Sequence, residues 1–239
     1  MNDEYLIFLS EFQELFLNYL DTEKQLQEIN ECDEDFKKIF EFLSEKNIFN
    51  NKSDLKIILL MIVVNSNNHF RQINFYSKIL LILTKLKPQL QQYTNKELFT
   101  IFGSNKRILL FLLEEKLLFI DTEMNDYLLK KYDCYFYFQK YLHPGTSNNG
   151  YNYTIKINED LQKEGENDHF FAQIIRKDNL DEFINQLQTN SITCNSQIDE
   201  SIYETNEFYI TNYFPTFIEY AAFCGSINIF KYLSLQKAK

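Results

Sequence analysis

The segment FIEYAAFCGSINIFKYL, from Phe217 to Leu233, places two alanines and a glycine between runs of large apolar residues, in a chain with only five glycines among its 239 residues. Small side chains are needed where two helix backbones approach closely, and glycine tolerates the positive φ that ends many helices. We therefore predict two antiparallel helices, TFIEYAAF and SINIFKYL, that meet at Ala221 and Ala222 and break at Gly225.

The upstream segment FFAQIIRKDNLDEFINQL repeats this pattern. Asn179 stands where the second unit has Gly225, because asparagine also tolerates the left-handed backbone conformation. The apolar residues of the two second helices then align: Phe183, Ile184 and Leu187 with Ile229, Phe230 and Leu233. In the last helix, Ile229, Phe230, Tyr232 and Leu233 are predicted to form the buried stripe. The C-terminal part of the chain is thus predicted to hold two helix pairs.

Helical spacing of apolar residues continues through the N-terminal half. The segment EYLIFLSEFQELFLNYL is predicted to be an amphipathic helix whose apolar stripe holds Leu6, Leu9, Phe12, Phe16 and Leu20. Ser53 is expected to start one helix, while Thr94 with Glu97 and Thr216 with Glu219 fit the capping box. Further helices are predicted at Asp35–Glu45, Asp54–Val64, Phe70–Leu86, Lys96–Phe102, Asn105–Glu115, Glu123–Tyr132 and Tyr135–Leu142.

Three of these N-terminal helices share a signature of two apolar residues, any residue, and two more apolar residues. It occurs at residues 39–43, 79–83 and 108–112, at intervals of the size of helix-pair repeats. Many amphipathic helices carry the same signature by chance. Degenerate repeats and an unrelated helical bundle therefore both remain open for this half.

The clearest internal boundary is HPGTSNNGYNY, from His143 to Tyr153, which is rich in turn-forming residues. It divides the chain into a helical region at 1–145 and a C-terminal region at 146–239. A second polar stretch, from Thr189 to Tyr213, is predicted to be a long insertion between helices at about 189–214, with local hairpin character.

The segment YAAFCGSINIFKYL resembles an ankyrin repeat, whose helix pair reads A-A-x-x-G-H-x-x-V-V-x-L-L. The matching residues are Ala221, Ala222, Gly225, Ile229, Phe230, Tyr232 and Leu233. Ser226 replaces the histidine, the T-P-L-H start is poorly kept, and 46 positions separate Asn179 from Gly225 against about 33 in ankyrin repeats. The whole C-terminal region is similar to a divergent ankyrin-like family expanded in trichomonad protozoa.

This resemblance implies a non-enzymatic scaffold that binds proteins through a concave surface and loops. It puts Phe223 and Cys224 at exposed, variable positions, and Phe214 in the loop that precedes the repeat. For Phe223, a place in the core between repeats is an open alternative.

A net charge of −10 and the absence of a Lys/Arg stripe argue against nucleic acid and anionic membranes as partners. The longest apolar run, Leu55–Val64, is too short to span a bilayer. The four cysteines lie far apart without metal-ligand spacing, which indicates free thiols in a reducing cytoplasm and no metal site. The N-terminus carries acidic residues where a signal peptide needs a basic start.

No phosphate-binding glycine loop or nucleophile elbow occurs in the sequence, and its three histidines are isolated. We therefore expect no enzymatic activity and no cofactor. The predicted fold class is an all-α helical repeat, or solenoid, with ankyrin-like helix-turn-helix repeats at the C-terminus. The expected function is a scaffold for protein partners; the alternative is a structural protein that self-associates through its uncapped C-terminal repeat.

Overall fold

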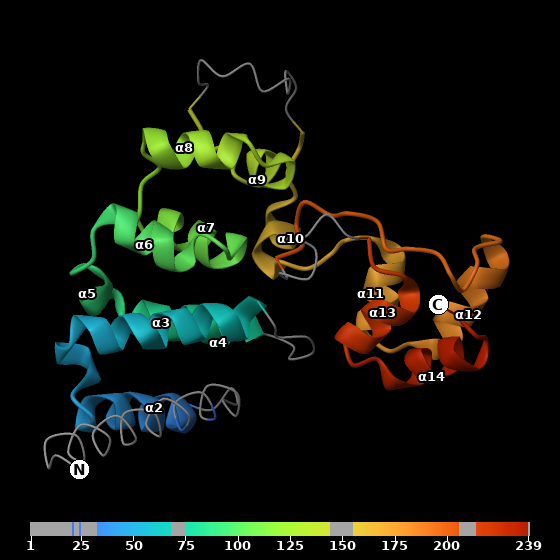
Figure 1. Ribbon diagram of the computed structural model, residues 1–239, viewed down its shortest axis with the longest axis horizontal. Coiled ribbons are helices and arrows are strands. Elements are labelled where there is room, and N and C mark those ends of the chain that lie inside the picture. Colours follow the sequence, from blue (N-terminus) through green and yellow to red (C-terminus); the bar gives the residue numbers. More distant parts are fainter. Residues whose placement is uncertain are drawn as a thin grey trace, which may run out of the picture.

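The computed structural model describes residues 21, 24, 33–67, 75–143, 155–205 and 214–238, and all regular secondary structure in this part of the chain is helical. Figure 1 shows the helices in chain order. Their bounds are α2 Asp33–Glu45, η1 (a 3-10 helix) Ile48–Asn50, α3 Lys52–Asn67, α4 Phe75–Lys85, α5 Lys87–Leu90, α6 Asn95–Phe102, α7 Lys106–Glu114, α8 Thr122–Leu129, α9 Tyr132–Tyr137, α10 Glu159–Glu164, α11 Phe170–Arg176, α12 Leu180–Thr189, α13 Phe217–Phe223 and α14 Ile227–Leu235.

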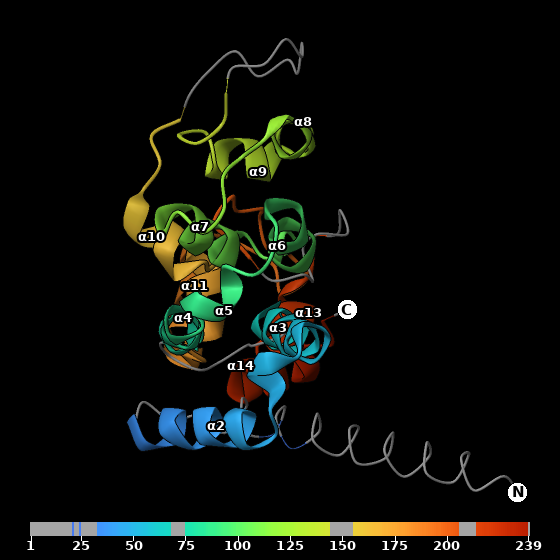
Figure 2. The same ribbon diagram turned by 90° about the vertical axis from the view of Figure 1, so that its left-hand side faces the viewer.

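The N-terminal helices form tiers of two, with α3 beside α4, α6 beside α7, and α8 beside α9 (Figures 1 and 2). Successive tiers keep their order, because α3 contacts α6 and α4 contacts α7. The signatures at 79–83 and 108–112 lie in α4 and α7, so these two matching segments pack against each other. The first signature, at 39–43, lies in α2.

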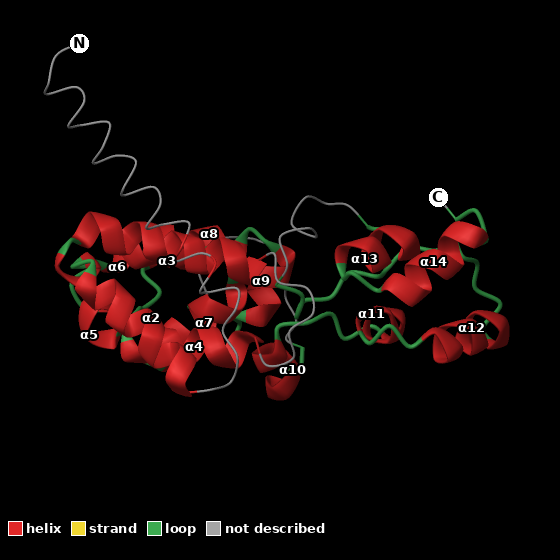
Figure 3. Cartoon of the chain, turned by 90° about the horizontal axis from the view of Figure 1, so that it is seen from below, coloured by secondary structure: helices red, strands yellow, loops and turns green. Residues whose placement is uncertain are grey.

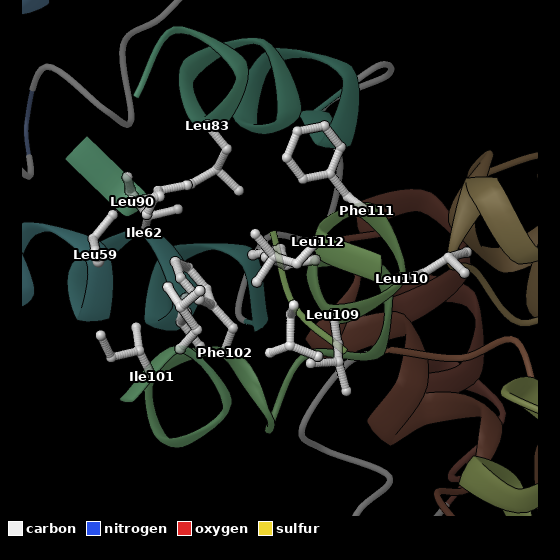
Figure 4. Close-up of a cluster of buried hydrophobic side chains, with 14 of the residues drawn as sticks. Leu59, Ile62, Leu83, Leu90, Ile101, Phe102, Leu109, Leu110, Phe111 and Leu112 are labelled. Carbon is white, nitrogen blue, oxygen red and sulfur yellow. The ribbon is translucent and has the colours of Figure 1, made fainter. Parts of the chain in front are cut away.

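Helix α7 lies at the centre of the N-terminal core. Every residue from Lys106 to Leu113 is buried, which is typical of a helix enclosed on all sides. Figure 4 shows side chains of α3, α4, α6 and α7 pointing toward one another, including Leu59, Leu83, Phe102 and Leu112. One continuous cluster of buried apolar residues thus joins the tiers.

A second apolar cluster lies in the C-terminal unit formed by α11–α14, at the opposite end of the molecule from α2–α6 (Figure 3). Helix α11 packs on α12 and α13 on α14, while α11 also contacts α13 and α12 contacts α14. The rings of Phe171 and Phe217 stack with their centroids 4.9 Å apart, which joins the first helices of the two pairs.

Helix α10, which the sequence did not predict, connects the two clusters. Tyr137 donates its hydroxyl hydrogen bond to the carbonyl oxygen of Gln162 at 2.7 Å, and Arg107 Nε donates to the carbonyl oxygen of Lys163 at 2.6 Å. Lys106 Nζ donates to the carbonyl oxygen of Ile202 at 2.9 Å. Side chains of the N-terminal core thus bind the backbone that leads into the C-terminal unit.

The predicted helices occur, with shifted ends. Helix α3 begins before Ser53, whose backbone N–H donates to Asn51 Oδ1 at 3.0 Å, so Asn51 and not Ser53 supplies the cap. The capping box of Thr94 and Glu97 is confirmed. Helix α9 begins at Tyr132 and ends at Tyr137, earlier than predicted at both ends. The predicted N-terminal helix and most of the boundary segment at 143–153 lie outside the described residues.

The polar insertion is partly buried in its described part, residues 190–205. Ile198, Tyr203 and Glu204 are buried there. Gln197 and Thr216 pair as an isolated antiparallel bridge, and Ile198 N–H donates to the carbonyl oxygen of Pro215 at 2.8 Å. This single pairing joins the insertion to the residues that precede α13; local hairpin character within the insertion stays a prediction.

We expect Asn105→Ala to lower the free energy of unfolding by about 2–4 kcal/mol, because it removes a helix cap and a buried partner at once. Asn105 Oδ1 accepts from the N–H of Ile108 at 2.9 Å, and Asn105 Nδ2 donates to Asn67 Oδ1 at 2.6 Å, both residues being buried. Urea denaturation followed by circular dichroism measures the change. The control is Asn185→Ala, whose exposed side chain lies on α12, expected within about 0.5 kcal/mol of the parent. Equal losses in both variants would contradict the assignment.

Candidate partner-binding surface

The predicted helix-turn-helix is present at α13 and α14. Gly225 has a φ of 64°, in the left-handed region, as the small-residue pattern predicted. The N–H of Ser226 donates to the carbonyl oxygen of Ala221 at 2.8 Å, and that of Gly225 to Ala222 at 3.1 Å. These two bonds are the Schellman arrangement that ends a helix and reverses the chain. Thr216 and Glu219 form the predicted capping box at the start of α13.

The two alanines differ in their surroundings. Ala221 is fully buried in the C-terminal cluster, whereas Ala222 is exposed. Adjacent helical residues point about 100° apart, so both cannot face the same neighbouring backbone. The prediction is confirmed for Ala221 and is wrong for Ala222.

The upstream turn is shifted by one residue from its predicted place. Asp178 has the positive φ, 52°, while Asn179 has a φ of −83°. Asn179 caps α12 instead, where its Oδ1 accepts from the N–H of Glu182 at 3.3 Å. Asp178 and Asn179 therefore correspond in backbone conformation to Gly225 and Ser226. The prediction that Asn179 occupies the glycine position is wrong.

Asp178 also connects the two helix pairs. Its carboxylate accepts from the backbone N–H groups of Asn228 at 3.1 Å and Ile229 at 3.0 Å, at the start of α14. Ser226 Oγ donates back to the carbonyl oxygen of Ile175 in α11. A carboxylate at a helix N-terminus satisfies amide groups and opposes the helix dipole. The turns of the two pairs are thus fixed against each other.

The aligned apolar residues of the second helices are only partly equivalent in burial. Phe183 and Leu187 in α12 are buried, as are Ile229 and Leu233 in α14, while Ile184 is half-buried. Phe230 is 39% exposed, so its predicted burial is wrong. Figure 3 shows α14 on the outer side of the unit, where no described helix covers it.

The three candidate partner-binding residues have different environments. Phe214 is exposed and lies next to Pro215, whose carbonyl anchors the bridge before α13. Phe223 is half-buried and packs against the C-terminal cluster, which favours the core alternative for part of its side chain. Cys224 is fully buried, and burial raises the pKa of its thiol to about 12. The prediction of an exposed Cys224 is wrong, because Cys224 lies three residues after Ala221 and four after Tyr220, on the buried side of α13.

A polar cluster that the sequence did not predict surrounds Arg176, whose side chain is 10% exposed. Arg176 in α11 contacts Glu166 at 3.1 Å and Glu204 at 3.8 Å, and it donates to the Tyr220 hydroxyl at 3.1 Å. Burial opposes the charge of Arg176, yet Tyr220, Glu204 and Glu166 together hold its pKa above the usual value. Arginine suits such a site because its five donors serve several acceptors at once.

Helix α14 exposes large apolar side chains beside polar ones such as Lys231. Ile227 is 56% exposed and Phe230 39% exposed, and their spacing of three residues puts them on the same side of α14. Ile229 and Leu233, on another side of α14, are buried in the C-terminal cluster. We call the exposed residues Ile227 and Phe230 of α14 the outer apolar face.

The described residues were also compared with the requirements of metal sites, membrane-spanning helices and nucleophilic thiols. Among the described residues, no group of three or more His, Cys, Asp or Glu side chains could hold a metal ion, and no described helix has the length and apolar character needed to cross a membrane. Cys134 is buried like Cys224, and burial raises the pKa of its thiol to about 12. A thiolate nucleophile is therefore not favoured at either position.

Comparison with protein-family models, with curated proteins and with solved structures finds no match to this chain. The proposed function therefore rests on the sequence and on the geometry described above.

We expect Ala221→Leu to destabilise the protein by about 1–3 kcal/mol, because the larger side chain overpacks the contact between α13 and its neighbours. Ala222→Leu is the matched control, one residue away and exposed, and is expected to change stability by less than about 0.5 kcal/mol. Thermal melts of both variants test the difference. Equal losses would contradict the orientation assigned to the two alanines.

We expect Arg176→Met to lower stability by about 2–4 kcal/mol, because it removes the positive charge beside the buried carboxylate of Glu204 while keeping most of the side-chain volume. The control is Lys96→Met, which breaks the exposed ion pair with Glu123, also at 3.1 Å. Exposed pairs contribute about 0–1 kcal/mol. Chemical denaturation that ranks Lys96→Met as the more damaging change would overturn the role given to Arg176.

Proposed function

We propose that this chain is a non-enzymatic scaffold that binds other proteins through a stack of ankyrin-like helix pairs. The observation that carries the proposal is the ordered packing of the C-terminal unit, in which first helix contacts first helix and second contacts second. Stacked repeats share a continuous core and leave extended surfaces for partners.

Three local features support an ankyrin-like reading of the two pairs. Each pair turns at a residue with positive φ, Asp178 or Gly225. The second pair is preceded by the bridge between Gln197 and Thr216, as expected for the loop that leads into an ankyrin-like repeat. The tiers α3/α4 and α6/α7 pack in the same order. This order supports an interpretation of the N-terminal helices as stacked helix pairs too.

The outer apolar face is the proposed contact for a protein partner. It lies on the pair α13/α14, which packs on α11/α12 through apolar side chains such as Phe171, Phe217 and Leu233. A partner that presents an apolar helical surface would extend this packing. Phe214, exposed in the loop before α13, is proposed as a second contact at the edge of the concave side.

The proposed setting is the cytoplasm. Cys134, Cys194 and Cys224 are free thiols, as in proteins of reducing compartments. The net charge of −10 supports protein partners over nucleic acid. The lack of catalytic sequence motifs supports a binding role without cofactor.

Self-association is the alternative function. The outer apolar face is present on every copy, and Leu235, at the end of α14, is also exposed. Two such faces could pair across a two-fold axis, as in most homodimers. A structural protein that assembles through this face would then need no other partner.

Affinity capture from the source cell with the parent chain and with Phe230→Glu tests the proposal. We expect proteins bound by the parent to be reduced at least tenfold with the variant, because a carboxylate in an apolar contact cannot be solvated. Gln188→Glu, exposed on α12, is the control and should retain them. Thermal melts establish that all three chains are folded.

Analytical ultracentrifugation of the same three chains separates the two functions. The scaffold is supported if the parent chain stays monomeric and if, of the two variants, only Phe230→Glu loses the bound proteins. Concentration-dependent dimers that Phe230→Glu abolishes would favour self-association. Identical bound proteins and identical mass in all three chains would overturn both.

A further inference from the structure

The described end of the polar insertion, residues 199–205, has no regular secondary structure and lies against helices of both apolar clusters. We call residues 199–205 the strap; in Figure 1 the chain returns along it from α12 toward α10. Its main chain is hydrogen-bonded at four positions. The bonds are Asn167 Nδ2 to Asp199 O at 3.0 Å, His169 Nε2 to Glu200 O at 3.0 Å, Lys106 Nζ to Ile202 O at 2.9 Å and Thr205 N to Gly165 O at 3.2 Å.

Two side chains of the strap are also bound, both from its single turn. Tyr203 is 7% exposed, and its hydroxyl accepts from the N–H of Asn158 at 3.0 Å. Glu204 is 4% exposed, lies 3.8 Å from Arg176, and accepts from the Tyr220 hydroxyl at 3.4 Å. The strap is thus held as a bound peptide is, by its main chain and by the side chains of one tyrosine and one glutamate.

The cations that bind the strap have a second partner on the helices themselves. Lys106 lies 2.8 Å from Asp133 of α9, and Arg176 lies 3.1 Å from Glu166. A buried charge is costly when it is left unpaired. Release of the strap leaves both cations paired, while Glu204 moves into water. The helices therefore need no new partner for a charge when the strap leaves.

Apolar packing contributes little to holding the strap. Among residues 199–205, Tyr203 is the only buried apolar side chain, and none of these residues belongs to either apolar cluster. Segments with few buried apolar contacts and no ladder of backbone hydrogen bonds open locally while the core of a protein stays folded. The strap is the part of the C-terminal region that fits this description.

We propose that the strap is an intrachain ligand that covers a peptide-binding surface, formed by Lys106, Asn167, His169 and Arg176. A partner protein binds this surface through a turn that carries the same Tyr-Glu pair, once the strap is released. Because the strap is tethered beside the surface, it competes at a high effective concentration and makes the contact autoinhibitory. This surface is separate from the outer apolar face, so the inference does not depend on the proposed function.

A dye-labelled synthetic peptide of residues 196–205 tests the proposal with the full-length chain, by fluorescence anisotropy. The double variant Tyr203→Ser/Glu204→Gln lacks the two side chains that hold its own strap. We expect it to bind the peptide about tenfold more tightly than the parent chain, whose strap competes. The matched control peptide carries the same two replacements and is expected to bind the double variant about tenfold more weakly.

Further replacements in the double variant locate the bound peptide. Lys106→Met is expected to weaken binding about tenfold, because it removes a charged donor to the peptide backbone. His169→Ala, whose side chain is 42% exposed and whose loss the fold tolerates, is expected to weaken it about threefold. Lys96→Met, exposed on α6, is the control and should leave binding unchanged.

Circular dichroism should show the parent's helical content in the double variant, because the proposal requires the helices to stay folded without the strap. Loss of helix in the double variant would overturn the proposal. So would equal binding by parent and double variant, equal binding of the two peptides, or unchanged binding in both Lys106→Met and His169→Ala.

Discussion

The described helices of this chain are too short to be stable alone, so every part of the fold depends on burying an apolar face against a neighbour. The longest, α3, has 16 residues, and several have fewer than nine. Isolated helices below about 12–15 residues are marginal in water. Stacking solves this for α7, which is enclosed by its own tier and by the tiers beside it. Because each helix must bury its apolar face, exposed apolar residues at the ends of the stack indicate where another helix or a partner could pack.

Polar contacts then fix how the stacked pairs are oriented. Asp178 holds the first amides of α14, and Ser226 returns a hydrogen bond to α11. Apolar packing alone tolerates small rotations of one helix pair against another, because it is not directional. Hydrogen bonds from one turn to the next limit these rotations. The insertion adds to this, since Glu204 lies 3.8 Å from Arg176 of α11 and the hydroxyl of Tyr203 accepts a hydrogen bond from the N–H of Asn158.

Local sequence signals predicted the helices and the sharp turn at Gly225 well, because periodicity and small residues act over a few positions. They failed where the answer depended on which side of a helix faces a neighbour. Ala222 and Cys224 fit a repeat pattern in sequence, yet one points outward and the other inward. Asp178 was missed because a left-handed aspartate resembles the neighbouring asparagine in propensity. No local pattern could predict that Glu204, far along the chain, pairs with Arg176.

The bonds from α7 and α9 to the backbone around α10 bear on whether the two halves are separable. Arg107 and Tyr137 belong to the N-terminal core, but their acceptors, Lys163 and Gln162, lie beyond the predicted boundary at 145. A chain cut at that boundary would leave a buried guanidinium and a buried phenol in need of new acceptors. Fragments taken at the boundary would therefore lose these hydrogen bonds, and leaving their buried donors without acceptors would cost stability.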